Sequence, residues 1–291
     1  MSDVIRPEVK VFFDPVTNTV TSIVKDPNSE HVAIIDSVMG FDYASGRTER
    51  ALADELIAYV EAQRLKVDWI LETHAHADHL SAAPYLKRKL GGKVAIGADI
   101  QTIQGVFGEL FNEGADFLRD GSQFDHLFVD GERFMIGGME ATVMHTPGHT
   151  PACVSYHIGD ALFVGDTLFM PDFGTARCDF PGGSAEQLFD SVGRILELPA
   201  ETRMFVGHDY KAQGRDEYAW ETTVGAQREA NVHVGAGRSR EGFVEMRQRR
   251  DATLSMPKLI VPAIQVNIRA GNMPEPDGAG RVFLKVPVDA L

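Results

Sequence analysis

The segment from Thr73 to His79 contains four metal-capable side chains within six consecutive residues: His74, His76, Asp78 and His79. It follows an apolar, β-branched run at 67–71 that predicts a buried strand. Imidazole and carboxylate groups at the end of a buried strand lose solvation free energy unless a cation binds them. In an extended segment the first three would share one face and His79 would point elsewhere. The pattern therefore predicts a site for one metal ion or for two adjacent ions.

Three further segments each place a metal-capable side chain directly after a glycine: His149, Asp166 and His208. A glycine lets the backbone turn sharply, so the next side chain projects from the edge of a sheet. Each segment alone is equally well explained as an ordinary polar turn. Together with the first segment, however, they complete a coordination set. Histidines outside such settings are assigned to structure or surface: His31, His126, His145, His157 and His233.

Strands and helices must bring these turns together. Runs of β-branched and aromatic residues predict strands at 9–13, 19–24, 31–36, 67–71, 94–96, 133–136, 140–145, 153–157, 161–164 and 203–206. Apolar periodicity predicts helices at about 48–63, 81–90, 99–111 and 184–196. From Asp216 the pattern is helical, then apolar at 259–268, and it ends in a Gly/Pro-rich tail. This order predicts two packed sheets with helices on the outer faces, an α+β architecture.

The charge balance limits the partners to be expected. The chain carries 42 acidic and 28 basic residues, a formal net charge of −14. A field of this sign repels nucleic acid and anionic membranes. The one basic cluster alternates with acidic residues, and this mixture predicts a solvated helix face. Its members are Arg238, Arg240, Arg247, Arg249 and Arg250. We therefore expect neither a nucleic-acid nor a membrane partner.

Cysteine usage and apolar run length indicate the compartment. The two cysteines, Cys153 and Cys178, are too few for a disulfide framework and are not spaced as a CxxC metal pair. The first fifteen or so residues lack a basic segment followed by an apolar run. No apolar stretch approaches the roughly 18 residues of a membrane span. We expect a cytoplasmic protein with reduced thiols.

The HxHxDH segment, the TPGHT turn at His149, the Gly-Asp pair at Asp166 and the Gly-His-Asp triplet at His208 follow one another in this order. Jointly they resemble the metallo-β-lactamase superfamily, over roughly residues 8–212. The resemblance implies an αββα sandwich of two mixed β-sheets, with helices on both outer faces and the metal in a cleft along the sheet edges. It also implies a catalytic domain at 1–215, with 216–291 as a helical and extended C-terminal extension packed on the core.

Two branches of this superfamily use these residue types. In hydrolases of the glyoxalase II type, the whole set would hold two metal ions bridged by Asp166, which lower the pKa of a bound water. The persulfide dioxygenases bind one iron. By similarity its ligands would be His74, His149 and Asp166, a facial triad with open positions for substrate and oxygen. The remaining members would then orient the ligands and bound water. They are His76, Asp78, His79 and His208.

Three features favour the dioxygenase branch. The Ala-Asp-His-Leu sequence that ends the first segment is similar to the dioxygenase form, whereas glyoxalase II usually has a bulkier residue before the aspartate. The segment 175–180 resembles a Gly-Arg-Thr-Asp-Phe segment of that family, with Cys178 where threonine is usual. The triplet at His208 continues into Tyr210, as in that family. The tail at 259–269 resembles bacterial β-lactamase-like hydrolases associated with sulfide detoxification.

The resemblance implies one Fe(II) per chain and oxidation of glutathione persulfide, or a related low-molecular-weight persulfide, by O2 to sulfite and thiol. A net-negative tripeptide needs cationic and hydroxyl partners, for which we choose Arg177 and Tyr210. An ion pair between Arg177 and Asp179 that supports the loop is an equal alternative. Cys178 and Asp179 belong to the possible pocket, although packing is the favoured role for Cys178.

Two alternatives remain open. The first is a binuclear thioester hydrolase with two zinc, iron or manganese ions, because His and Asp accept all three metals. The second is a non-catalytic sulfide or persulfide sensor, which the full ligand set and the lack of a basic DNA-reading helix disfavour. A homodimer is the usual expectation for a soluble enzyme, and the tail after Asp216 offers an interface.

Overall fold

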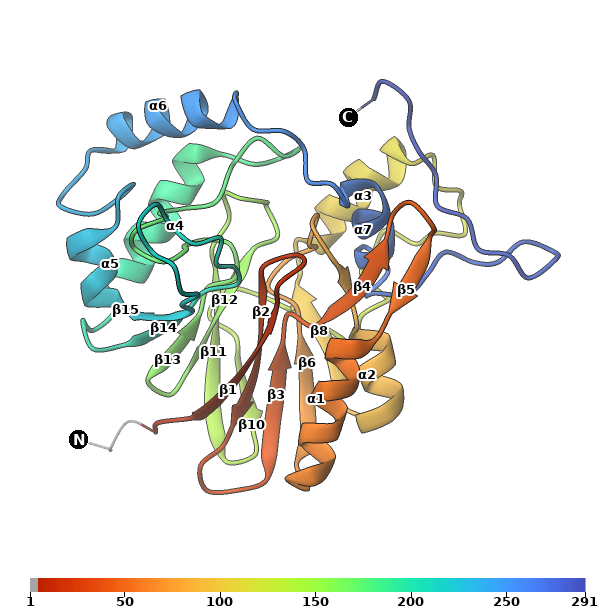
Figure 1. Ribbon diagram of the computed structural model, residues 1–291, viewed down its shortest axis with the longest axis horizontal. Helices are drawn as coiled ribbons and strands as arrows, with labels where there is room; N and C mark the ends of the chain where they lie inside the picture. The colour runs from red at the N-terminus through yellow and green to blue at the C-terminus, as the bar shows by residue number, and fades with distance from the viewer. Residues whose placement is uncertain (1–4, 291) are drawn as a thin grey trace.

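The computed structural model describes residues 5–290 and contains two six-stranded mixed sheets packed face to face (Figure 1). The first sheet runs β1 (Glu8–Asp14), β2 (Thr19–Lys25), β3 (His31–Ile35), β6 (Lys66–Leu71), β8 (Lys93–Gly97) and β9 (His126–Phe128). Its strands from β3 to β9 are parallel, whereas β1, β2 and β3 pair antiparallel. Parallel strands end at one edge, which places the segment after β6 beside the end of β3.

The second sheet is mostly antiparallel. It runs β10 (Arg133–Ile136), β11 (Met139–His145), β12 (Val154–Ile158), β13 (Ala161–Phe163), β14 (Arg203–Phe205) and β15 (Glu221–Thr223). Only the pair β13 and β14 is parallel. The turns that follow these two strands therefore emerge side by side, and they carry Asp166 and His208.

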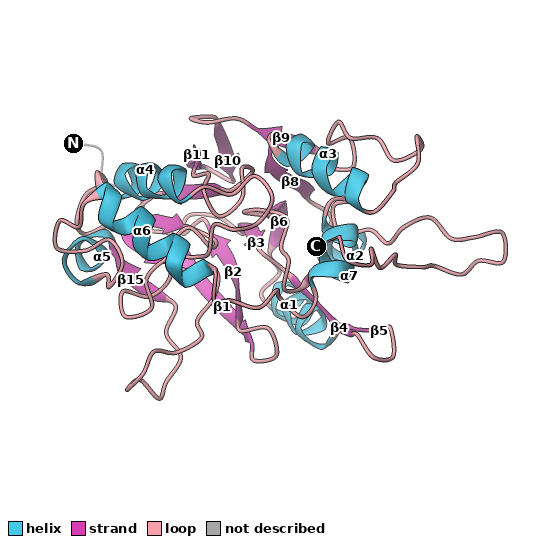
Figure 2. Cartoon of the chain, turned by 90° about the horizontal axis from the view of Figure 1, so that it is seen from above, coloured by secondary structure: helices cyan, strands magenta, loops and turns pink. Residues whose placement is uncertain are grey.

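Helices cover the outer face of each sheet, as Figure 2 shows from above. The first sheet carries α1 (Ala51–Ala62), α2 (Ala83–Leu90), α3 (Ile100–Leu110) and α7 (Ile260–Asn267). The second carries α4 (Ala185–Leu196), α5 (Val224–Ala230) and α6 (Arg240–Asp251). The predicted αββα sandwich is thus confirmed.

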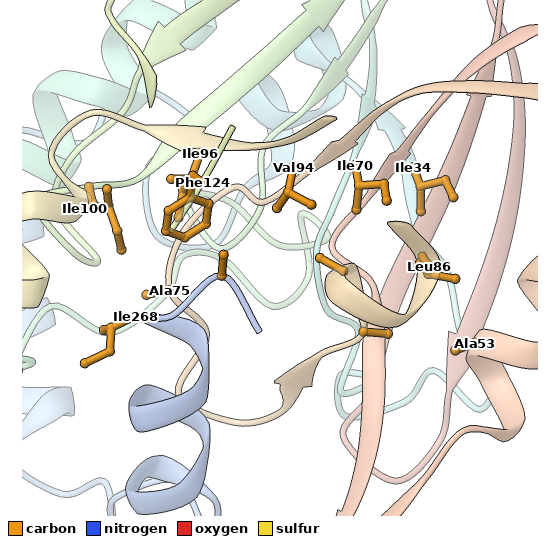
Figure 3. Packing of buried hydrophobic residues seen from close by; sticks show 14 of the residues in the cluster. Ile34, Ala53, Ile70, Ala75, Leu86, Val94, Ile96, Ile100, Phe124 and Ile268 are labelled. Atoms are coloured by element: carbon orange, nitrogen blue, oxygen red, sulfur yellow. The ribbon is translucent and has the colours of Figure 1, made fainter. Parts of the chain in front are cut away.

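Three buried clusters fill the spaces between the layers. Between the sheets, Leu71 of the first sheet meets Val143 and Tyr156 of the second. Under the helices of the first sheet, strand residues such as Ile34, Ile70 and Val94 face Ala53 of α1 and Leu86 of α2 (Figure 3). Leu188, Val192 and Ile195 of α4 recur at helical spacing and pack on the second sheet.

The segment after Asp216 contributes to both halves of the sandwich. Its strand β15 closes the edge of the second sheet, α6 packs against α4, and α7 lies on the helical layer of the first sheet (Figure 1). Residues 272–290 contain no helix or strand. The structure therefore joins the C-terminal extension to the core at two separate places.

Several short elements and one side chain differ from expectation. The three-stranded sheet of β4 (Val38–Asp42), β5 (Arg47–Glu49) and β7 (Leu80–Ser81) was not predicted, nor were β9 and β15, because such strands are too short to show a period. The expectation that the basic cluster is wholly solvated was wrong for Arg247, which is 1% exposed.

Within residues 5–290 no helix combines the length and apolar character needed to span a bilayer. The prediction that no signal segment is present rests partly on residues 1–4, which lie outside the described residues.

Candidate metal centre

The His-rich segment leaves β6 through a turn that Asp36 fixes. Asp36 follows β3 and accepts hydrogen bonds at 2.8 Å from both the amide N–H and the hydroxyl of Thr73. Its backbone has a φ of +54°, a left-handed conformation that aspartate tolerates better than most residues. The two neighbouring parallel strand ends are therefore tied together where the ligands begin.

Glycine is required at two of the predicted turns. A Cβ at Gly165 would lie 2.4 Å from the Thr73 hydroxyl oxygen, and the residue has a φ of +50°. A Cβ at Gly148 would lie 2.4 Å from the backbone of Leu188 in α4. Both turns can approach their neighbours only without a side chain. This is the role that the sequence predicts for the residues preceding Asp166 and His149.

His74, His149 and Asp166 converge, as predicted, although they come from three separate turns. The Oδ2 atom of Asp166 lies 3.9 Å from Nε2 of His74 and 3.8 Å from Nε2 of His149. These distances are too long for hydrogen bonds, so the three atoms surround a space between them. All three side chains are buried.

The outer nitrogen of each histidine in this triad is held by the protein. Nδ1 of His149 donates to the backbone carbonyl oxygen of Arg177 at 2.8 Å. Nδ1 of His74 lies 3.0 Å from the hydroxyl of Thr73, which itself donates to Asp36. Bonding at Nδ1 leaves the Nε2 lone pair of each ring directed at the central space, the arrangement usual for metal-ligating histidine.

His76, Asp78, His79 and His208 form a second group beside the triad. Nδ1 of His208 lies 2.6 Å from Oδ1 of Asp166, and its Nε2 lies 2.7 Å from Asp78. Nδ1 of His79 is 3.4 Å from the same carboxylate of Asp78. Nε2 of His76 faces Asp36 at 3.0 Å and Glu72 at 3.2 Å. Within this group His208 is hydrogen-bonded at both ring nitrogens, whereas Nδ1 of His76 and Nε2 of His79 have no partner among the described residues.

His79 differs from the sequence expectation. The segment alternates as predicted up to Asp78, since Ala75 and Ala77 enter the apolar cluster while His74 and His76 face the site. The chain then bends at 77–79, and the ring of His79 comes to 4.2 Å from that of His76. The prediction that His79 points elsewhere was wrong, because the segment is a loop and not a continued strand.

The donor set fits a transition metal. Among the described residues, Nε2 of His74, Nδ1 of His76 and Nε2 of His79 are buried and have no hydrogen-bond partner. Leaving a buried polar atom unpaired costs about 1–3 kcal/mol, so three in one site indicate a missing partner. Two imidazoles and one carboxylate match the ligands that iron, zinc and manganese accept.

Electrostatics prepare the triad for a cation. Burial lowers the pKa of His74 well below its usual range, so the ring is neutral and its Nε2 lone pair is available. Burial opposes ionisation of Asp166, yet His208 and the triad histidines hold the pKa of this carboxyl below its usual range. His208 behaves oppositely: burial lowers its pKa, but the charges of Asp166, Tyr210 and Asp78 outweigh this and raise it. A neutral His74 and an ionised Asp166 are the forms of these two side chains that bind a cation.

The family model described as Metallo-beta-lactamase superfamily matches residues 14–208, which include every one of these ligands. The chain belongs to the metallo-β-lactamase superfamily. A probable metallo-hydrolase of Burkholderia pseudomallei is 51% identical over 97% of this chain and 99% of its own length. The beta-lactamase hydrolase-like protein of Agrobacterium fabrum is 54% identical over 98% of this chain, which spans 65% of that longer protein.

A more distant part of the superfamily includes a dioxygenase. The mitochondrial persulfide dioxygenase ETHE1 of Bos taurus is 28% identical over 90% of this chain and 88% of its own length. The crystal structure of ETHE1 from Myxococcus xanthus matches with a TM-score of 0.72 and 29% identity, covering 91% of this chain and 100% of that one. Members of this superfamily are metal-dependent enzymes, and these relatives carry names of different activities, a hydrolase and a dioxygenase.

A large open pocket of about 1330 Å³ leads to the metal centre of this superfamily member. Asp78, His149 and Asp166 line it on the ligand side. Aromatic side chains supply much of its wall: Phe13, Phe41, Tyr43, Phe169, Phe173, Phe180 and Tyr210. The mixture of an apolar wall with a few polar groups at one end is typical of small-molecule sites.

The predicted substrate residues have different surroundings. Arg177 lines the pocket, but its guanidinium makes two 2.6 Å contacts with Asp179 and donates to the carbonyl of Ser255 at 2.7 Å. These contacts are those of the loop-supporting alternative. The Tyr210 ring lines the pocket and stacks on His208 with an interplanar angle of 3°, and its hydroxyl bonds to no other described residue.

Cys178 and Asp179 do not line the pocket. The Cys178 side chain packs in the cluster beneath α4 and α6, and its amide N–H donates to Asp251. Burial raises the pKa of its thiol, which is therefore unreactive. Cys178 thus has the packing role that the sequence analysis favours, and the possible place of both residues in the pocket is not found, because the 175–180 segment turns these side chains away from it.

Sequence reasoning missed the residues that hold the ligands. Asp36, Glu72 and Asn267 all contact the His-rich segment. Asp36 had one signal, an aspartate at the end of an apolar strand, as with Asp166. Asn267 had none, since it lies far away in the chain on a helix whose other residues are apolar apart from Gln265.

Proposed function

We propose that this protein is a persulfide dioxygenase with one Fe(II) per chain, held by His74, His149 and Asp166. It oxidises glutathione persulfide, or a related low-molecular-weight persulfide, with O2 and water to sulfite, thiol and two protons. The sulfane sulfur loses four electrons, and O2 gains four. The observation that carries the proposal is the open triad, whose facing atoms stand 3.8 and 3.9 Å apart, beside a His208 ring that bonds to Asp166 at 2.6 Å and to Asp78 at 2.7 Å.

The residues around the triad orient its three ligands. When bound, Fe(II) would supply open coordination positions and the redox chemistry that O2 requires. The carbonyl of Arg177 and the hydroxyl of Thr73 orient the two histidines. His208 holds one oxygen of Asp166 at 2.6 Å, which leaves the other oxygen for the central space. Outer partners of this kind raise ligand basicity and fix geometry.

The pocket suits an anionic thiol of tripeptide size. Its volume of about 1330 Å³ exceeds what such a substrate fills, and its walls include the exposed side chains of Arg250 and Lys258. Neither side chain makes an ion pair or a hydrogen bond with another described residue. We propose that these two cations bind the substrate carboxylates, with Tyr210 beside the reacting sulfur. In this proposal Arg177 shapes the wall through its pair with Asp179.

The test is made on protein purified without oxygen. Metal analysis should give one iron per chain, and added glutathione persulfide should consume one O2 for each sulfite formed. S-lactoylglutathione should not be hydrolysed under the same conditions. Hydrolysis of the thioester without oxygen consumption would overturn the proposal.

A second candidate is a binuclear hydrolase of the glyoxalase II type. It is favoured by the unpartnered nitrogens of His76 and His79, which are the atoms that a larger ligand set would use. The hydrolase names of the more similar relatives agree with it. Two ions of zinc, iron or manganese per chain, with thioester hydrolysis, would establish this candidate.

A further inference from the structure

The last residue of α7, Asn267, reaches into the His-rich segment. Its side-chain N–H groups donate to the carbonyl oxygens of His76 and His79, both at 2.8 Å. Its side-chain oxygen accepts the amide N–H of Ser81, also at 2.8 Å. The residue is only 4% exposed. One buried amide from the C-terminal extension therefore satisfies three backbone groups of the metal-ligand segment.

The apolar side of the same segment also rests on α7. Ala75 and Ala77 share a buried cluster with Ile264 and Ile268 of that helix region, and Figure 3 places Ala75 beside Ile268. A Cβ at Gly271 would lie 2.9 Å from the carbonyl oxygen of Ser81, so the end of α7 approaches the segment closely. The backbone and the apolar side of the segment are thus both contacted by residues that follow position 259 in the chain.

A second contact reaches the other ligand turn from α6. Arg247 and Asp251 form a buried ion pair at 2.6 Å, with side chains 1% and 6% exposed. Arg247 donates to the carbonyl of Thr175 at 3.1 Å, and Asp251 accepts the amide N–H of Cys178 at 2.9 Å. Between these two backbone groups lies Arg177, whose carbonyl accepts the Nδ1 proton of His149.

We propose that the C-terminal extension positions the metal ligands from two sides. Asn267 holds the His74–His79 segment, and the Arg247–Asp251 pair holds the carbonyl that orients His149. These are positioning residues, since none of them belongs to the proposed ligand set. The inference requires a metal centre but not the dioxygenase reaction, so metal affinity tests it independently of turnover.

The burial of these polar groups argues against a role in packing alone. A buried ion pair often stabilises a fold no better than apolar residues of similar size. An uncharged helix surface would cover the core equally well, yet Asn267, Arg247 and Asp251 each bond to backbone in or beside the ligand turns. On the same helix, the Arg249–Glu245 pair is 74% and 73% exposed and contacts neither turn. This exposed pair provides a matched control.

The experiment measures metal affinity by competition with a chelator, using Co(II) as an optical probe and Fe(II) without oxygen. Asn267→Asp keeps the size but removes both donors, and should lower affinity by about 10- to 100-fold, as for other outer partners. Asp251→Asn should lower affinity similarly and shift the cobalt absorption bands, because His149 loses its fixed orientation. The controls Asn272→Asp, near the end of the same helix, and Glu245→Gln should match the unmodified protein.

Hydrogen exchange of the unmodified protein supplies a test that does not depend on folded variants. Coupling is reciprocal, so ligands held by the extension must hold the extension more firmly when metal is bound. Added metal should slow exchange at the amides of Ser81 and Cys178 and along α6 and α7, with little change in α1. Unchanged exchange at these amides would overturn the proposal. So would unchanged affinity in folded Asn267→Asp and Asp251→Asn, or equal losses in the controls.

Discussion

The two groups of metal-capable side chains use the same residue types and differ in what their atoms contact. In the triad, Nε2 of His74 is buried and unpartnered, and Asp166 stands 3.9 Å away. In the second group, His208 lies between two carboxylates, at 2.6 Å from Asp166 and 2.7 Å from Asp78. The triad atoms stand apart, whereas in the second group one imidazole lies between two carboxylates, and Nδ1 of His76 and Nε2 of His79 remain unpartnered beside it.

This difference shows why ligand type alone does not set the number of metal ions. A histidine between two aspartates keeps the charged form, since the pKa of His208 is raised by Asp166 and Asp78 although burial opposes it. A positively charged ring in place of a cation neutralises both carboxylates. The contacts around His208 are therefore where a one-metal site and a two-metal site would differ, although the motif is the same for both.

The strongest way to break this comparison is to remove one ligand from each group. His74→Ala should abolish metal retention and lower kcat/KM by more than about 100-fold, beyond the effect of outer partners. His79→Ala should keep one metal per chain and lose about 10-fold in activity. Metal analysis and steady-state kinetics check both. Equal loss of one of two metals in each variant would contradict the contrast and favour the binuclear site.

Metal removal should lower the free energy of unfolding, an effect smaller than the loss of activity expected for His74→Ala. At a free metal concentration 100 times Kd, binding stabilises the native state by about 2.7 kcal/mol, because the ion binds the folded ligand set. Chelation should therefore lower the Tm by several degrees, measured by calorimetry. For each variant the Tm is compared with and without chelator. Chelation should lower the Tm of His79→Ala by the same amount as that of the unmodified protein, and should leave the Tm of His74→Ala unchanged. An increment in His74→Ala would show that the second group binds metal by itself.

Most of the sandwich follows from the sequence, because its strands and helices are long enough to show a period. The triad also follows, since each of its members comes directly after a strand and parallel or adjacent strands end together. His79 was misplaced because one bend, at 77–79, cancels the alternation of an extended chain. The possible place of Asp179 in the pocket failed for a similar reason: spacing does not fix which side of a loop faces a cavity.

The contacts that hold the ligands were beyond sequence reasoning. Asn267 lies 191 residues along the chain from His76, and its amide contacts backbone, which has no residue-specific signal. Arg247 shows the same limit, because its i,i+4 partner Asp251 looks like an ordinary exposed helix pair. Only tertiary packing buries this pair while leaving the similar Arg249–Glu245 pair in solvent.

A milder substitution sharpens the comparison within the second group. Asp78→Asn keeps an oxygen that accepts from His208 but removes the charge that helps to hold this ring cationic. We expect one metal per chain to remain, with affinity lowered about tenfold, because Asp166 is then less firmly oriented. Chelator competition measures the affinity. A fall from two metals to one would instead identify Asp78 as a ligand of a second ion.

The smallest effect concerns the pocket wall, away from both groups. Arg250→Ala and Lys258→Ala should each raise KM for glutathione persulfide about fivefold with kcat unchanged, because an exposed cation contributes modestly to binding a carboxylate. Metal content should stay at one per chain in both. Arg249→Ala is the control, since Arg249 pairs with Glu245 and does not line the pocket. A fall in kcat, or an equal rise of KM in the control, would show that these two cations do not bind the substrate carboxylates. Tyr210 would then be the remaining candidate for a substrate-binding residue.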